Sequence, residues 1–225
     1  HNDELKKFNV ILANPPYSIK AWDQKGFTND PYGRNLWGVP PQGCADYAFQ
    51  QHILKSLDTN NGRSISLWPH GVLFRDSEAE MRKRMIEEDV VECVISLGPN
   101  LFYNSSMTSC LLITNNNKTP ERKNKVLFVQ AVNEVRNEKT ISYLDPHHIE
   151  RIHNAYLNFK NEDTFTAVVD KENILKDKNI RLSVQLFVKE DEIDEEDFDV
   201  LLNTWEQNRI ELDDSMNELF KTLAN

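Results

Sequence analysis

The residues best suited to chemistry stand near the amino terminus, in the run Asn14-Pro15-Pro16-Tyr17. The side-chain oxygen of Asn14 and the backbone carbonyl of Pro15 accept hydrogen bonds, and two successive prolines remove backbone donors and fix φ. Such a stiff loop can hold both N–H groups of an amine on an aromatic ring. That amine is a poor nucleophile because its lone pair is delocalised into the ring. Two acceptors would pull it toward the tetrahedral geometry that attack on a methyl donor requires, while Tyr17 offers a flat face for the ring.

Adenine is an aromatic ring with such an amine, but a base inside a duplex cannot reach this loop, so its nucleotide must be flipped out. Stacking of the flipped base on an aromatic side chain recovers part of the free energy lost on unstacking. No titrating general base is required. The alternative is that Asn-Pro-Pro is merely a turn after a strand. The placement of the run favours chemistry, because a strand-like apolar run precedes it, an aromatic residue ends it and a long loop follows.

The elements that must position this loop follow from residue periodicity. Residues 8–13 predict a strand that ends at the prolines, and residues 18–43 predict an active-site loop without regular structure. Helices are predicted over residues 45–57 and, capped at Ser77, over residues 77–88, with a solvated face that includes Arg82. Strands are predicted over residues 64–68, 90–97 and 109–114. This order indicates an α/β sheet with ligands at the carboxyl ends of its parallel strands, where Asn14 lies.

Beyond residue 115 we predict strands over residues 126–131, 165–169 and 182–188, and a helix capped by Asp145 with Pro146 at its first position. These elements complete one domain, residues 1–190. Residues 191–225 predict an acidic helix whose seam residues are spaced alternately by four and three. The seam consists of Phe198, Leu202, Trp205, Arg209, Leu212, Met216, Leu219 and Leu223. This pattern favours packing of the seam against a helix of a partner protein. The alternative is an amphipathic helix that packs against its own domain.

The composition limits the classes of function. The 225 residues, of which 39% are hydrophobic, suffice for a packed core. No apolar run is long enough for a membrane helix and no signal peptide is present, so a cytoplasmic protein without membrane contact is expected. The three cysteines are predicted to be buried reduced thiols, and no metal site is expected. The net charge of -10 argues against a domain that binds nucleic acid through its own charge alone.

Asn14 to Tyr17 resembles the catalytic motif of amino-group methyltransferases, which use S-adenosylmethionine. Further motifs narrow the resemblance to the modification subunit of type I restriction-modification systems, a DNA adenine-N6 methyltransferase, over residues 8 to about 190. These motifs are Pro40-Pro41-Gln42-Gly43, Ala45-Asp46-Tyr47-Ala48-Phe49, Pro69-His70-Gly71-Val72-Leu73-Phe74 and Pro99-Asn100-Leu101-Phe102-Tyr103. The resemblance implies the carboxy-terminal half of a doubly wound S-adenosylmethionine-dependent methyltransferase sheet, followed by a C-terminal helical tail.

The resemblance also implies roles for single residues. Asn14, Pro15, Pro16 and Tyr17 would be catalytic, with Asn14 and Pro15 holding the amine and lying beside the cofactor. Tyr17 would stack on the flipped adenine. Phe102 is a candidate for the opposite face of the base, and its alternative role is a hydrophobic plug under a loop.

Asp46 and His70 are typical of this family, but neither receives a reaction step. A helix cap and a loop hydrogen bond are the simpler interpretations of these two residues. The partners implied by the resemblance are DNA, a specificity subunit on whose helices the tail packs, a second modification subunit and a restriction subunit.

The family's glycine-rich cofactor turn is not found in this sequence. Its glycines stand at positions 26, 33, 38, 43, 62, 71 and 98, so no two have G-x-G spacing and all follow Asn14. The sequence therefore predicts a fragment that lacks the cofactor half and is inactive alone. Two classes stay open, the catalytic part of a DNA methyltransferase and a module for assembly with a specificity subunit. A protein glutamine-N5 methyltransferase is a further alternative, against which the long carboxy-terminal extension argues.

Overall fold

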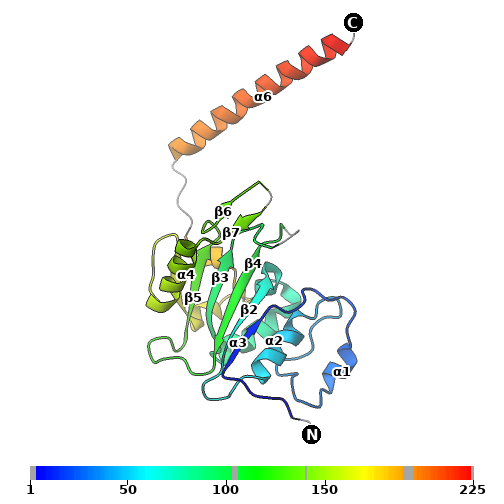
Figure 1. Ribbon diagram of the computed structural model, residues 1–225, viewed down its shortest axis with the longest axis vertical. Helices are drawn as coiled ribbons and strands as arrows, with labels where there is room; N and C mark the ends of the chain where they lie inside the picture. Colours follow the sequence, from blue (N-terminus) through cyan, green and yellow to red (C-terminus); the bar gives the residue numbers. More distant parts are fainter. Residues whose placement is uncertain (1–3, 103–105, 140, 190–194, 224–225) are drawn as a thin grey trace. The chain divides into compact units, whose positions relative to one another are not determined.

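The computed structural model describes residues 4–102, 106–139, 141–189 and 195–223. The chain forms two compact units, His1–Lys189 and Glu190–Asn225. The first unit is built on a six-stranded sheet with the strand order β1-β2-β4-β3-β5-β8 (Figure 1). Its strands are β1 (Val10–Ala13), β2 (Arg63–Pro69), β3 (Val91–Leu97), β4 (Ser109–Asn115), β5 (Lys125–Ala131) and β8 (Thr166–Asp170). A two-stranded ribbon pairs β6 (Arg136–Asn137) with β7 (Ser142–Tyr143).

The sheet is mixed. Strand β1 is parallel to β2 and β3 is parallel to β5, whereas β4 is antiparallel to both of its neighbours and β8 is antiparallel to β5. Strand β4 reverses because the connection after β3 holds no crossover helix in its described residues, and a parallel return needs such a crossover. It follows that β1, β2, β3 and β5 run in one direction, so their carboxyl ends share one edge of the sheet.

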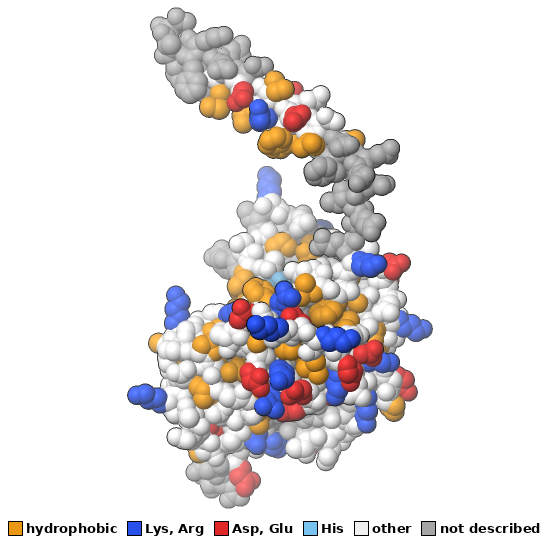
Figure 2. Space-filling view, turned by 180° about the vertical axis from the view of Figure 1, so that it is seen from behind, with side chains coloured by type: hydrophobic (Ala, Val, Ile, Leu, Met, Phe, Trp, Pro, Cys, Tyr) orange, Lys and Arg blue, Asp and Glu red, His pale blue; other side chains and the backbone are white. Residues whose placement is uncertain are grey.

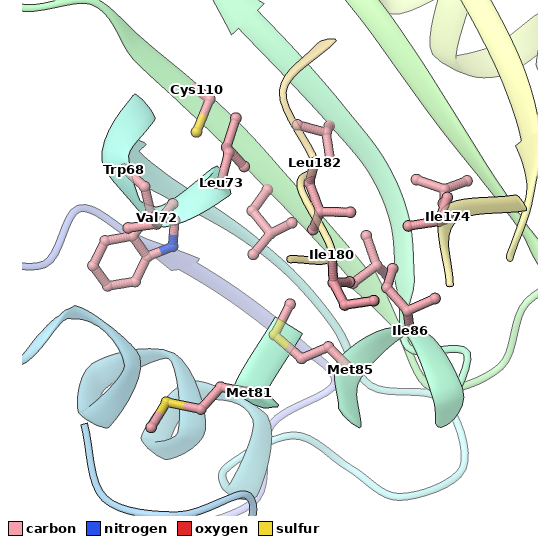
Figure 3. Close-up of a cluster of buried hydrophobic side chains, with 14 of the residues drawn as sticks. Trp68, Val72, Leu73, Met81, Met85, Ile86, Cys110, Ile174, Ile180 and Leu182 are labelled. Atoms are coloured by element: carbon pink, nitrogen blue, oxygen red, sulfur yellow. The ribbon is translucent and has the colours of Figure 1, made fainter. Parts of the chain in front are cut away.

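Helices cover the two faces unequally. On one face α2 (Asp46–Lys55), α3 (Ala79–Glu87) and the short turn η1 (His70–Leu73) enclose the larger core, in which Trp68 and Phe128 are fully buried. Figure 3 shows side chains of η1, α3 and the segment around Ile180 and Leu182 meeting in this core. On the other face α4 (Pro146–Asn158) packs Ile152 against β3 and β5. The predicted α/β class is confirmed.

Several predicted elements are confirmed in detail. The predicted helix over residues 45–57 is α2, and α4 begins at Pro146 directly after Asp145, as expected. Cys44, Cys93 and Cys110 are buried and free. The long loop after Tyr17 is irregular apart from α1 (Gln24–Thr28), which the sequence did not predict.

The strand predicted over residues 182–188 is wrong. Its central residues form the short 3-10 helix η3 (Val184–Leu186). Leu182 donates its backbone N–H to Leu73 of η1, at 2.8 Å, and Val188 bonds back to Val184, so the segment has no sheet partner. Its alternating apolar pattern reflects burial of Leu182 and Val184 in the larger core and not a strand ladder.

The start of the helix after Ser77 also differs from its prediction. Ser77 lies inside the 3-10 turn η2 (Asp76–Glu78), and α3 begins at Ala79 without a side-chain cap. The short helix α5 (Lys171–Ile174) follows β8. Arg82 of α3 is fully buried, which corrects the prediction that it belongs to a solvated face.

The second unit contains the single described helix α6 (Glu195–Leu223), as the sequence predicts. Four apolar seam residues are exposed, namely Leu202, Trp205, Leu212 and Met216, and Figure 2 shows hydrophobic side chains along this helix. The side chains of the other apolar seam residues, Phe198, Leu219 and Leu223, lie outside the described residues. Within the part of the chain that the structure describes, no helix is both long and apolar enough for a transmembrane span.

Candidate active site

The Asn14-Pro15-Pro16-Tyr17 run leaves the sheet at the carboxyl end of β1. Ala13, the last residue of β1, pairs with Ser66 of β2, and the two prolines end the ladder because they cannot donate to it. Asn14 is exposed and Tyr17 is half-buried, with its side chain against the larger core. The strand, the loop and the aromatic residue therefore have the arrangement that the sequence predicts.

Tyr17 and Asn14 contact one another directly. The Tyr17 hydroxyl donates a hydrogen bond to Asn14 Oδ1 over 2.8 Å. Burial raises the pKa of the Tyr17 phenol, so the group is a neutral donor near neutral pH. One of the two lone pairs of Asn14 Oδ1 is thus occupied, and an incoming N–H group can use the second one or replace the Tyr17 hydroxyl.

The neighbouring strand end carries His70. Its Nε2 lies 2.9 Å from the backbone oxygen of Ser109, which links the end of β2 to the start of β4. Burial lowers the pKa of His70, so its imidazole is neutral near neutral pH. The predicted loop hydrogen bond of His70 is confirmed.

Asp46 is not a helix cap, as one interpretation of the sequence proposed. Ala45 is the residue that precedes α2, and Asp46 is its first residue. The Asp46 carboxylate instead reaches the backbone N–H of Ser18, directly after Tyr17, and the guanidinium of Arg75. Arg75 is not among the residues predicted from the sequence, although it directly follows the motif that ends at Phe74.

Phe102 follows the carboxyl end of β3 and therefore belongs to the same edge of the sheet as Asn14. Its side chain is half-buried, and residues 103–105 lie outside the described part of the chain. The role of Phe102 on the opposite face of a base stays a prediction.

The charge of the chain is divided between the two units. Residues 190–225 contain 13 of the 36 acidic residues but only 2 of the 26 basic ones, a net charge of -11, which leaves +1 for residues 1–189. In the view of Figure 2, acidic and basic side chains are interspersed over the first unit. The acidity that argues against a nucleic-acid partner thus belongs to the α6 unit and not to the unit that carries Asn14.

Comparison with known proteins gives concordant results. The family model described as N-6 DNA Methylase matches residues 1–196. The MjaVIII methylase subunit of Methanocaldococcus jannaschii, a type I restriction enzyme subunit, is 35% identical over 196 residues, which cover 84% of this chain and 33% of that protein. The MpnII methylase subunit of Mycoplasma pneumoniae, also from a type I restriction enzyme, is 31% identical over 196 residues. The aligned segment covers 86% of this chain and 35% of that protein.

A solved structure agrees with these sequence relatives. The methyltransferase subunit of the type I restriction-modification system from Streptococcus thermophilus superposes with a TM-score of 0.74 at 33% identity, over 82% of this chain and 39% of that one. The chain spans about a third of the length of the curated relatives that it matches. The residues that the family model matches include Asn14 to Tyr17 and the ends of β1 and β2, and the chain belongs to the N-6 DNA methylase family.

Proposed function

We propose that this chain is the target-base part of a DNA adenine-N6 methyltransferase, the modification subunit of a type I restriction-modification system. The observation that carries the proposal is the Asn14 to Tyr17 loop at the carboxyl end of β1, within the segment that matches the N-6 DNA methylase family. A protein glutamine-N5 methyltransferase finds no support, since the relatives reported above are named as DNA restriction-system subunits.

The chain's own residues have separate tasks in this proposal. Asn14 Oδ1 and the Pro15 carbonyl accept the two N–H groups of the adenine amine, which frees its lone pair for attack. Pro16 keeps the loop stiff, and the Tyr17 ring stacks on the flipped base. The exposed position of Asn14 lets a base enter from solvent, and the methylated nitrogen can release its extra proton to water.

S-adenosylmethionine supplies the methyl group when it is bound. The described residues fit only one side of such a site: Asn14 and Pro15 border it, and the chain has no glycine pair at the spacing of a cofactor turn. The remaining contacts must come from a further segment of polypeptide.

Strand β1 leaves one edge of the sheet open to that segment. In the described part of the chain β1 pairs only with β2, and its residues Val10 and Leu12 are 57% and 74% exposed. Ile65 of β2 shares their face, which continues into an apolar groove of about 420 Å³ beside α4. An open strand edge with an exposed apolar face is rarely left uncovered, so we assign this face to the cofactor-binding half of the sheet.

Assembly is the second role that an observation favours. The exposed seam of α6 fits helices of a specificity subunit, and the complete enzyme would add DNA, a second modification subunit and a restriction subunit. Since its substrate would be cellular DNA, we place the protein in the cytoplasm.

The test of the proposed function is Asn14→Ala in the full-length parent protein. Loss of a preorganised polar contact of this kind should lower turnover by about a hundredfold or more. The measurement is transfer of labelled methyl groups from S-adenosylmethionine to DNA. Asn117→Ala is a matched control, because Asn117 follows β4 at the opposite edge of the sheet. Near-native turnover of Asn14→Ala would contradict the assignment.

A further inference from the structure

The residue that follows the candidate catalytic run has an unusual backbone. Ser18 has φ of +48°, in the left-handed region that residues other than glycine rarely adopt. Its backbone N–H donates to Asp46 Oδ1 over 2.6 Å. A strained residue persists only when its surroundings hold it, and the Asp46 carboxylate supplies that restraint directly after Tyr17.

Asp46 is itself held by two neighbouring side chains. Its second oxygen, Oδ2, accepts from Arg75 at 2.5 Å and from the Cys44 thiol at 3.1 Å. The side chain of Asp46 is 1% exposed, so its charge must be paired inside the protein. Burial raises the pKa of the Cys44 thiol to about 12, which keeps the thiol protonated and able to donate.

Arg75 is fixed in turn from two directions. Its Nε donates to Glu78 Oε2 over 2.9 Å, and Glu78 is fully buried. A Cβ at Gly71 would lie 3.3 Å from the guanidinium carbon of Arg75, so the glycine lets the guanidinium approach the backbone. The three motif segments that contain Tyr17, Asp46 and Gly71 are thus joined through this one ion pair.

We propose that Asp46, held by Arg75, is a positioning residue of the methyltransferase, an inference that rests on the proposed function. It fixes the left-handed turn at Ser18, and this turn sets where Tyr17 and Asn14 stand for the flipped base. Asp46 does not contact the base or the cofactor itself, since both of its oxygens are already bonded and its side chain is buried.

The experiment compares variants of the full-length parent protein in methyl transfer. Asp46→Ala removes the acceptor and should lower kcat at least tenfold while the KM for S-adenosylmethionine stays within about twofold. Asp46→Asn keeps an oxygen for the Ser18 N–H and should recover most of the lost turnover. Ser18→Pro removes the donor and also excludes the φ of +48°, so it abolishes the left-handed turn itself. Because Ser18 is exposed, we expect the fold to survive while kcat falls at least as far as in Asp46→Ala.

Asp89→Ala is the matched control. Asp89 likewise binds a cation, Lys118, and accepts the backbone N–H of Asn124, which has φ of +59°. Asp89 precedes β3 and Asn124 precedes β5, so both lie at the amino ends of these parallel strands, at the opposite edge of the sheet from Asn14. The control should lower the melting temperature without changing kcat.

Hydrogen exchange of residues 14–20 gives a readout that does not depend on methylation. Asp46→Ala should accelerate exchange in this segment, whereas Asp46→Asn and Asp89→Ala should leave it unchanged. If the wild-type parent transfers no methyl group, the proposed function fails, while the exchange result still decides whether Asp46 holds the loop. Native exchange in Asp46→Ala, or native turnover in Ser18→Pro, would overturn the inference.

Discussion

Tyr17 has two chemical groups that act in opposite directions at the candidate site. The ring offers the surface on which a base can stack, but the hydroxyl takes one of the two lone pairs of Asn14 Oδ1, the acceptor that the proposed function assigns to the target amine. The hydroxyl therefore competes with the amine for the best position at this oxygen. Because the pKa of the phenol is raised, the hydroxyl keeps its proton and remains a competing donor near neutral pH.

Replacement of Tyr17 separates these two contributions. Tyr17→Phe keeps the stacking surface and removes the competing donor, so we expect kcat/KM at or above the wild-type value. Tyr17→Ala removes the stacking, which is worth about 1–3 kcal/mol, and should lower kcat/KM roughly five- to a hundredfold. Both values come from methyl transfer by the parent protein. If Tyr17→Phe is as slow as Tyr17→Ala, the hydroxyl and not the ring makes the essential contact.

Among the elements, α3 depends on a buried cation. Arg82 donates to three backbone carbonyls, those of Ile180, Asn179 and Val72, at 2.8, 2.9 and 3.3 Å. One guanidinium thereby joins α3 to the turn η1 and to the segment before η3. This cation has no access to DNA phosphates, because its side chain is fully buried.

Arg82→Met should therefore destabilise the first unit without a direct effect on binding. The methionine fills much of the space but leaves buried carbonyls without donors, at a cost of about 3 kcal/mol or more. Arg84→Ala on the same helix is the control, since its exposed pair with Glu80 contributes about 1 kcal/mol or less. Urea unfolding midpoints measure both changes. Equal midpoints for the two variants would show that the Arg82 bonds add little stability.

At the scale of the molecule, the two units have different physical characters. The first is nearly neutral, with a packed core on one sheet face and an open apolar area on the other. The second is a strongly acidic helix with exposed apolar side chains. Exposed apolar surfaces of this kind are rarely left uncovered, and the proposed function assigns a different partner to each.

The seam of α6 can be tested by its effect on assembly. Trp205→Ala with Leu212→Ala should weaken binding of a specificity subunit by several kcal/mol, since burial of each large side chain is worth roughly 1.5 to 3 kcal/mol. Asn203→Ala with Gln207→Ala changes the opposite face of the helix and should have no effect. Co-purification with a tagged specificity subunit measures the difference. Unchanged assembly, with α6 already protected from hydrogen exchange in the free chain, would show that the helix packs within its own protein.

The open side of the sheet leads to a prediction about the cofactor. This chain alone should bind S-adenosylmethionine weakly or not at all, because in the proposed function Asn14 and Pro15 supply only one border of the site, and the sequence has no two glycines at G-x-G spacing. Titration calorimetry measures the affinity. Micromolar binding by the chain alone would show that these described residues already form the cofactor site.

The sequence by itself determined the α/β class, the loop at Asn14 and the long helix of the second unit. Each of these depends on local rules: prolines end a strand, apolar periodicity distinguishes helices from strands, and an acceptor-rich loop suits an amine. For the same reason residues 182–188 were wrongly predicted as a strand, since their alternating pattern cannot distinguish a ladder from burial against other elements.

Only the tertiary structure decided the contacts between distant segments. The burial of Arg82 against Ile180 and the hydrogen bond from Ser18 to Asp46 both depend on residues that are far apart in the chain. Arg75 and Asp46 are 29 positions apart, and no periodicity relates them. The type of a charged residue does not show whether its side chain is solvated on a helix or paired in the interior. Its burial and its partners depend on which groups the fold places beside it.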